Sequence, residues 1–387
     1  MNFTLLKKGL PVSISVFFFI FFIYLFSNHN LKNNYKHQVL LADSLVKGRC
    51  DLISNPLNYH DVFPVKGKLY TAFSPLPILF LTPLTMVFGT NTNQVLLSII
   101  IGALNSAILY LILKKLKINL KNIYLIMVAF SLGTINWYAS VIGTSWYFSH
   151  IIAVFCLLLS LYFIFDKKIF IAGLFFGFAF ASRFPIITAL PALLVLITAL
   201  TVKNRLKKIL TFIGGIFPGL LIIFSYNYCR FGSLWETGYT YANLVYTAYE
   251  PTPSFSLQYL PRNLYIFLFK GYDFISQFPW LNPDPQGLSI FLTSPFLIFA
   301  FKAGKNKKIT LPFWTAVLSI AAVVLTYFLT GWYQFGYRFL LDFLPFLIIL
   351  TALGMEKINS NLVKLSLISI SIVFNALGVY WGLKLGW

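Results

Sequence analysis

The chain has 387 residues, of which 58% are hydrophobic, 19% aromatic and only 10% charged. Soluble domains carry about 25% charged residues, so this composition excludes a water-soluble protein. The formal net charge of +20 does not indicate a partner nucleic acid, because nucleic-acid binding needs a basic face on a soluble body.

The first apolar segment, residues 10–26, follows Lys7 and Lys8 and leads into no small-residue cleavage site. It therefore predicts an uncleaved membrane-crossing helix. Further segments reach the roughly 17–25 helical residues that a crossing needs. The sequence predicts about eleven crossings, two of them within 169–201: near 10–26, 94–113, 122–141, 147–165, 169–201, 209–227, 288–302, 311–330, 339–355 and 362–383.

The distribution of charge predicts the orientation of these helices. If 169–201 crosses twice and 76–89 lies along the outer interface, every basic loop falls on the side of Lys7 and Lys8. That side then holds 18 basic and two acidic residues, and the other side holds 12 and eight. Because cytoplasmic loops collect Lys and Arg, we predict a multi-pass protein of the plasma (inner) membrane with a cytoplasmic N-terminus and an extracytoplasmic C-terminus.

The expected fold class is an all-α transmembrane bundle over 1–387, with no separate soluble domain. Most of its acids fall on the extracytoplasmic side or at its membrane edge, where the charge rule does not require them. They are Asp43, Asp51, Asp61, Glu236, Glu250, Asp273, Asp284 and Asp342. We therefore expect any functional site that uses charged residues to lie on the extracytoplasmic side.

Two outer loops are long, at about 27–75 and 228–287, and long loops in membrane proteins usually carry function. The helical spacing of apolar residues in HQVLLADSLVKG predicts a short surface helix that ends at Gly48, and LPILFLTPLTMVFG predicts a second one. The second loop holds eight tyrosines and two tryptophans, which fit either an interfacial aromatic belt or a sugar or lipid site.

The cysteines and histidines do not indicate a disulfide framework or a metal site. Three cysteines are too few for a disulfide framework, and Cys156 lies in an apolar run, which leaves Cys50 and Cys229 as a plausible pair. No Cys/His cluster has the spacing of metal ligands. His150, at the start of the fourth crossing, is more often a hydrogen-bonded residue of a helix end than a functional one.

Charged residues near the predicted outer membrane boundary are stronger candidates for functional residues than the cysteines and histidines. Arg338 and Asp342 are four residues apart, which places them on one face of an α-helix. They form either a structural ion pair or a phosphate site in which Asp342 orients Arg338. Arg183, at the tip of the hairpin within 169–201, either binds phosphate in the same way or extends to the interface.

The order of several motifs resembles the GT-C superfamily of polytopic glycosyltransferases, which includes the protein O-mannosyltransferases and the aminoarabinose transferases of lipid A. The resemblance covers nearly the whole chain. It rests on Ala42, Leu45 and Gly48; on Asp61; on Gly67, Lys68, Tyr70, Phe73, Pro75 and Pro77 with the rest of PLPILFLTPLTMVFG; on Arg230-Phe231-Gly232-Ser233; and on Gln334-Phe335-Gly336-Tyr337-Arg338 with Asp342 and Pro345.

The resemblance implies transfer of a sugar from a polyprenyl-phosphate donor to a hydroxyl of a glycan, lipid or protein acceptor, on the outer face of the lipid bilayer. It implies Asp61 as the catalytic base or as a ligand of a divalent metal such as Mg or Mn, with Asp43 in reserve. Arg338, Arg183 and Arg230 would bind the donor phosphate. The supporting residues would be His60, Lys68, Tyr70, Tyr337, Asp342 and His150.

One departure from the superfamily leaves alternatives open. Many members place a catalytic acid about eight residues before the Ala of the first surface helix, where this chain has Asn34-Tyr35. Either the acid has moved, or the chain is a non-catalytic paralogue. A flippase or transporter for a lipid-linked sugar is the other alternative, although the chain shows no internal repeat and its intramembrane charges cluster near one edge.

Overall fold

A computed structural model describes residues 3–32, 34–54, 59–201, 203–246, 253–304 and 307–385. Glu250, one of the predicted outer acids, lies outside these residues. The structure is 71% helical. The helices are α1 (Phe3–Ser27), α2 (His37–Val46), α3 (Pro75–Phe88), α4 (Gln94–Lys115), α5 (Leu120–Leu132), α6 (Ile135–Ile142), α7 (Ser145–Phe165), α8 (Ile169–Ser182), α9 (Leu190–Leu200), α10 (Arg205–Phe231), α11 (Tyr239–Tyr246), α12 (Leu260–Leu268), α13 (Ile290–Thr293), α14 (Thr310–Leu325), α15 (Leu344–Met355) and α16 (Asn361–Leu385).

Short 3₁₀ helices and two hairpins complete the described chain. The 3₁₀ helices are η1 (Gly89–Asn91), η2 (Phe184–Ala189), η3 (Leu257–Tyr259), η4 (Pro295–Lys302) and η5 (Arg338–Asp342). Strands β1 (Phe63–Val65) and β2 (Lys68–Tyr70) pair antiparallel, as do β3 (Asp273–Phe274) and β4 (Leu281–Asn282). The fold is therefore mostly helical, as expected, with little sheet.

Five helices, α1, α4, α7, α10 and α16, are long and apolar enough to cross a membrane. The pair α5–α6, bent by 47°, adds a sixth if it counts as one span. Helix length thus does not confirm eleven crossings. The other predicted crossings appear as shorter apolar helices, several broken at a proline, because proline has no N–H for the preceding turn and starts a helix instead. Prolines occupy the first turns of η2, α9, η4 and α15.

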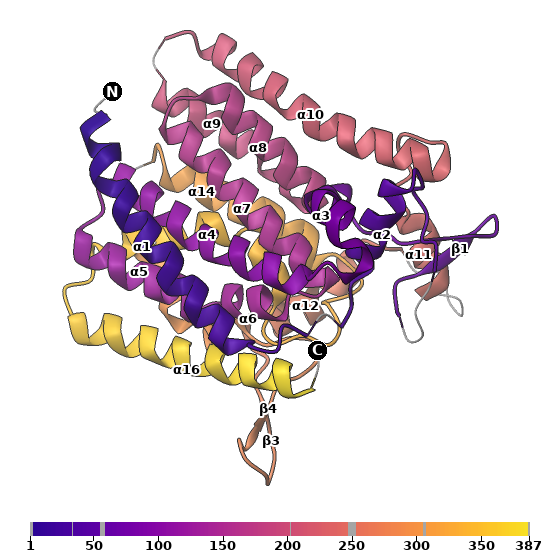
Figure 1. Ribbon diagram of the computed structural model, residues 1–387. Coiled ribbons are helices and arrows are strands. Elements are labelled where there is room, and N and C mark those ends of the chain that lie inside the picture. The colour runs from indigo at the N-terminus through magenta and orange to yellow at the C-terminus, as the bar shows by residue number, and fades with distance from the viewer. Residues whose placement is uncertain are drawn as a thin grey trace.

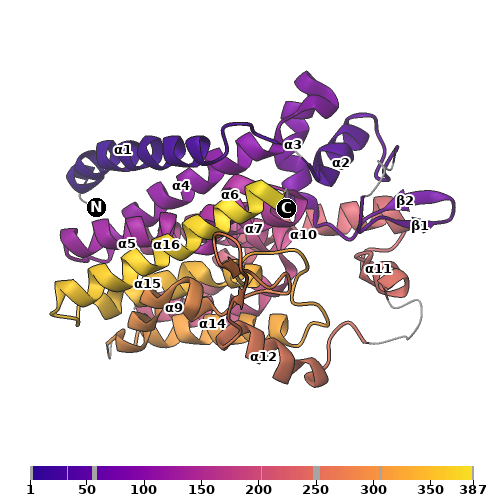
Figure 2. The same ribbon diagram turned by 90° about the horizontal axis from the view of Figure 1, so that it is seen from below.

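The helices form a bundle in which α10 and α16 lie on opposite sides (Figure 1). Both are exposed along much of their length, whereas α7 runs through the interior. In both views, α11 and the β1–β2 hairpin lie at the end of the bundle remote from the N-terminus (Figures 1 and 2). This end gathers the segments that follow α1 and α10.

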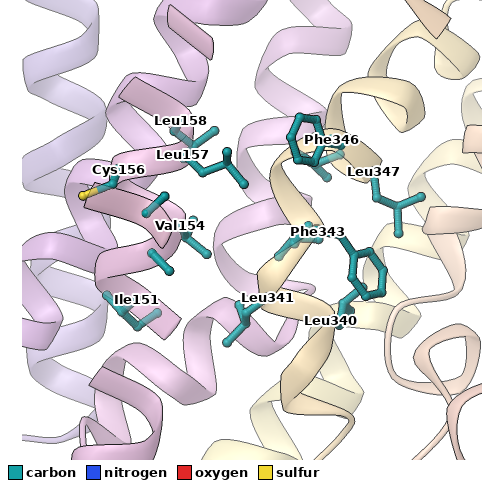
Figure 3. Close-up of a cluster of buried hydrophobic side chains, with 14 of the residues drawn as sticks. Ile151, Val154, Cys156, Leu157, Leu158, Leu340, Leu341, Phe343, Phe346 and Leu347 are labelled. Carbon is teal, nitrogen blue, oxygen red and sulfur yellow. The ribbon is translucent and has the colours of Figure 1, made fainter. Parts of the chain in front are cut away.

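The core beneath that end forms where α7 packs against η5 and α15. Ile151, Val154 and Leu157 of α7 face Leu341 and Phe343 across this contact (Figure 3). All five side chains are buried. The contact fixes the N-terminal turns of α7 relative to η5.

The segment after α1 contains both predicted helices, α2 and α3, but α2 is mostly buried and is not the amphipathic surface helix that the sequence predicts. Helix α2 ends shortly before Gly48, whose φ of +70° suits glycine, and it packs against α3. The β1–β2 hairpin, which was not predicted from the sequence, turns at Gly67 with a φ of +75°. Cys50 and Cys229 form a disulfide that joins this segment to the end of α10, and Cys156 is buried and free.

Candidate functional site

A cavity of about 720 Å³ opens at the end of the bundle that holds α11 and the β1–β2 hairpin (Figure 1). It lies among the N-terminal turns of α7, the junction of α8 and η2, the start of α11, the end of α14, and η5. Its charged or hydrogen-bonding lining residues are Asp61, Ser74, Trp146, Ser149, His150, Ser182, Arg183, Thr188, Thr237, Tyr239, Thr240, Ser254, Tyr327 and Arg338.

Asp61 is the one acidic residue among the described residues that line the cavity. Its backbone adopts a left-handed φ of +64°, which a short polar side chain tolerates better than most. The indole N–H of Trp146 donates a hydrogen bond to the Asp61 carboxylate. Burial raises the pKa of Asp61, and the hydrogen bond from Trp146 and the charge of Arg338 oppose that rise. The geometry leaves Asp61 poised as a proton acceptor.

Trp146 and His150 lie on the same face of α7, one helical turn apart, about 6 Å along the axis. Helix α7 starts at Ser145 because Gly143, with a φ of +56°, ends α6 just before it. The two side chains form hydrogen bonds with different carboxylates: Trp146 with that of Asp61, and His150 with that of Asp342.

Arg183 and His150 line the cavity and form a polar network with Asp342, which is buried behind them. Arg183 donates from Nε to Oδ1 of Asp342 at 3.0 Å and from Nη2 to Oδ2 at 2.9 Å. His150 Nδ1 donates to the same Oδ1 at 2.8 Å. Because Asp342 is fully buried, its charge requires these partners, and Arg183 is largely neutralised by it.

Arg338 has no ion-pair partner among the described residues, which corrects one of our expectations. The predicted pairing of Arg338 with Asp342 does not occur; Asp342 binds Arg183 instead. The physical reason is the 3₁₀ geometry of η5, whose three residues per turn place positions four apart on different faces. The guanidinium of Arg338 lies 5.9 Å from the centre of the Tyr147 ring and lines the cavity.

The cavity also has an apolar wall. Val323 and Val324 from α14, Phe328 and Leu329 after it, and Ile187 of η2 belong to the same lining as the charged groups. A cavity lined by both guanidinium groups and apolar side chains suits an amphipathic ligand with an anionic group and a hydrocarbon chain.

The predicted reserve base and one predicted phosphate ligand do not line the cavity. Asp43, the reserve base, lies on α2 and forms an ion pair with Lys47 at 2.7 Å. Arg230, predicted to bind phosphate, is buried and donates to the carbonyls of Thr71 at 2.8 Å and Thr237 at 3.1 Å. Since its hydrogen bonds go to segments that border the cavity, Arg230 supports the cavity from behind.

The other supporting candidates also lie apart from the lining. His60 is exposed, and its carbonyl accepts a hydrogen bond of 2.8 Å from His37 Nε2. Lys68 is exposed on β2, whereas Tyr70 is buried with its ring 5.1 Å from that of Phe231. Tyr337 is buried with its ring 5.2 Å from that of Phe267. Of the predicted site residues, the cavity lining thus includes Asp61, Arg183, Arg338 and His150, with Asp342 directly behind.

Three aromatic residues of the lining that carry a hydrogen-bonding group were not predicted as site residues from the sequence. They are Trp146, Tyr327 and Tyr239, the last of which was not distinguished from the other tyrosines of its loop. For Trp146 a signal existed, because its four-residue spacing from His150 places both on one helix face. Tyr327 directly follows α14 and carries no comparable local pattern.

The lining offers few ligands for a metal ion. Within the described part of the chain, no three His, Cys, Asp or Glu side chains form a group that could hold one. Among the lining residues that the structure describes, Asp61 alone supplies a carboxylate to the cavity, and Asp342 is engaged by Arg183 and His150. These residues do not fit a protein-held metal site, and the mechanism below uses none.

Comparisons with protein-family models, with curated proteins and with solved structures found no match to this chain. The cavity itself is therefore the basis of the function proposed below.

Proposed function

We propose that the protein is a membrane glycosyltransferase of the GT-C type that moves a sugar from a polyprenyl-phosphate donor to an acceptor hydroxyl. The observation that carries the proposal is the presence of Asp61, Arg183 and Arg338 in one cavity with an apolar wall. A carboxylate suits a proton acceptor, guanidinium groups suit a phosphate, and the apolar wall suits an isoprenoid chain.

In the proposed reaction the Asp61 carboxylate takes the proton of the acceptor hydroxyl while the hydroxyl oxygen bonds to the anomeric carbon of the donor sugar. The bond between that carbon and the phosphate oxygen breaks, and its electron pair leaves with the phosphate. Arg338 stabilises the developing negative charge. A phosphate needs no general acid to leave, so a single cavity carboxylate is sufficient, in contrast to the two carboxylates of glycoside hydrolysis.

Trp146 has the role of a positioning residue in this scheme. Its indole N–H fixes the orientation of the Asp61 carboxylate, and its ring lies 5.0 Å from that of Tyr35. Tyr35 belongs to the Asn34-Tyr35 pair that stands where many superfamily members have their acid. We propose that the acid has moved to Asp61 and that an aromatic contact fills the former place.

The proposal includes eleven crossings, with the N-terminus in the cytoplasm. The short apolar helices α8, α9, α14 and α15, together with α13–η4, supply the crossings beyond the six that length supports. In this arrangement the cavity opens at the outer face of the plasma membrane, where an outer-leaflet donor reaches it. Convergence of the charged groups on one end of the bundle favours a transferase over a transporter, which needs a route through the membrane.

The test compares wild type with Asp61→Asn in vesicles supplied with polyprenyl-phosphate hexoses and pentoses and with a panel of glycan, lipid and peptide acceptors that carry hydroxyl groups. Release of polyprenyl phosphate measures donor cleavage whatever the acceptor is. We expect Asp61→Asn to lower the rate by about 10²–10⁴, the usual contribution of a general base. Since burial raises the pKa of Asp61, the wild-type rate should also fall with decreasing pH at a value above that of an ordinary aspartate.

The control measurement compares the stability to unfolding of Asp61→Asn with that of wild type. The ionised carboxylate of a group with a raised pKa costs folding free energy at neutral pH, and asparagine still accepts the Trp146 hydrogen bond. Asp61→Asn should therefore unfold no more easily than wild type. Undiminished cleavage in this folded variant would remove Asp61 from the mechanism, and no cleavage by wild type across the donor panel would contradict the proposed function.

A further inference from the structure

The β3–β4 hairpin projects sideways from the bundle (Figure 1). Three large apolar side chains of this hairpin are exposed. Phe274 is 87% exposed, Phe278 63% and Trp280 59%. Their exposure is not scattered, because Phe278 and Trp280 are in contact, with ring centres 5.2 Å apart. Exposed groups of large apolar side chains usually mark an interaction surface.

The base of the hairpin is polar and firmly attached. Lys270 forms an ion pair of 2.9 Å with Asp284, and the Lys270 carbonyl accepts a hydrogen bond of 2.9 Å from the Ser289 N–H. Beside this base, Tyr272 stacks on Phe374 of α16 at 5.6 Å between ring centres. The hairpin therefore extends from the side of a helix that is long and apolar enough to cross the membrane.

Beside this contact, α16 exposes Ile370, Val373 and Tyr380. In a membrane-crossing helix such a surface faces lipid. A two-stranded hairpin also leaves the outer N–H and C=O groups of both strands unpaired, which excludes it from the hydrocarbon interior. The headgroup layer satisfies both demands, since it accepts aromatic rings and hydrates the backbone, and it is the preferred location of tryptophan.

We propose that the tip of the β3–β4 hairpin inserts into the headgroup layer of the bilayer through Phe274, Phe278 and Trp280, and anchors the outer loop laterally to the membrane. The anchor connects to the cavity. The residues after β4 bind the segment before Arg338: the Gln334 side chain donates to the Gln286 carbonyl at 2.8 Å, and the Leu288 N–H donates to the Gly336 carbonyl at 3.1 Å. Gln334 Oε1 in turn accepts from the Arg338 N–H at 3.2 Å. The inserted hairpin thus holds the loop that presents Arg338.

The test places a fluorescent label on Phe278→Cys in the full-length protein in phosphatidylcholine–phosphatidylglycerol vesicles. Quenching is measured with iodide in the water and with lipids that carry a spin label on the headgroup or deep in the chain. Lys68→Cys, an exposed position of the other hairpin, is the control, and Phe274→Cys repeats the measurement if Phe278→Cys folds poorly.

We expect the headgroup spin label to quench the Phe278→Cys label most strongly and iodide to quench it several-fold less than the Lys68→Cys label. Equal iodide quenching at both positions would place the hairpin in water and overturn the proposal. Strongest quenching from the deep spin label would contradict the headgroup location. A label shielded from every quencher would indicate a protein partner, such as a second copy of the chain, and would overturn the proposal as well.

Discussion

Two arginines, Arg183 and Arg338, line the same cavity, but they differ in their ion-pair partners. Arg183 neutralises the buried carboxylate of Asp342, while Arg338 has no ion-pair partner within the described residues. Removing one partner of a buried pair leaves an uncompensated charge, at a cost of about 3–5 kcal/mol. Removing an unpaired arginine carries no such cost.

This difference predicts opposite results for two alanine variants. Arg183→Ala should lower the free energy of unfolding by several kcal/mol, because it strands Asp342. Arg338→Ala should unfold like wild type and should weaken binding of polyprenyl phosphate at least tenfold, because charge-assisted hydrogen bonds to phosphate are lost. Thermal unfolding and binding of labelled polyprenyl phosphate measure the two effects. Normal lipid affinity in folded Arg338→Ala would refute its phosphate role.

His37 on α2 provides a test of pH dependence. Burial lowers its pKa to about 4, so folded His37 stays neutral while the unfolded chain takes up a proton near pH 6.5. The unfolded state therefore binds more protons between about pH 4 and 6.5, and stability falls as the pH falls through that window. Between pH 7 and pH 5 this group should cost roughly 2 kcal/mol.

The measurement is the unfolding midpoint across that pH range for wild type and His37→Gln. The variant should show a shallower dependence, because glutamine does not titrate. If the two pH profiles have the same slope, protonation of His37 does not control stability in this range.

Contacts between individual side chains are what the sequence predicts least well in this protein. The four-residue spacing of Arg338 and Asp342 predicts a local pair, but η5 is a 3₁₀ helix. The actual partners of Asp342, Arg183 and His150, lie 159 and 192 residues away in the chain. No local pattern reveals such distant contacts. Asp61 was identified from its motif, whereas its hydrogen bond from Trp146 required the fold.

At the scale of elements, a very close helix contact joins α8 and α10. Each helix contributes two small residues four apart, Gly173 and Gly177 on α8 and Gly215 and Gly219 on α10. A Cβ on Gly219 would lie 2.4 Å from the backbone of Gly177. Small residues at this spacing let membrane helices approach closely, so the spacing of these glycines is a sequence signal for the contact.

Gly219→Ala should therefore force α8 and α10 apart and lower the free energy of unfolding by about 1–3 kcal/mol, the usual cost of overpacking. Arg183 directly follows α8, so donor binding should weaken too. Gly214→Ala is the matched control, because a Cβ there meets no atom within 4 Å and alanine favours a helix. Equal stability of the two variants would show that the helices tolerate separation.

Element boundaries show why the crossings were only partly predictable. Apolar length identified α4, α7, α10 and α16 well, although α10 continues through Pro218. Around Pro185 and Pro345 the chain instead forms a 3₁₀ helix next to a short α-helix. Hydropathy records the apolar stretch but not where proline breaks it.

At the scale of the whole molecule, orientation is the prediction with the broadest consequences. The excess of basic residues predicts that Lys121 faces the cytoplasm and Lys68 the outside. Both side chains are exposed, so single cysteines at these positions can be compared directly. A membrane-impermeant maleimide should label Lys68→Cys in intact cells and Lys121→Cys only after permeabilisation. The reverse pattern would invert the proposed topology and move the cavity to the cytoplasmic face.

The disulfide between Cys50 and Cys229 also constrains how the molecule is made. Its two halves are 179 residues apart, so the segment that carries Asp61 emerges from the ribosome long before its anchor on α10 exists. During that interval α4 to α10 are synthesised while Cys50 has no partner. The link between the Asp61 segment and α10 is therefore a late event in biogenesis that requires an oxidant, and a chain truncated before Cys229 cannot form it.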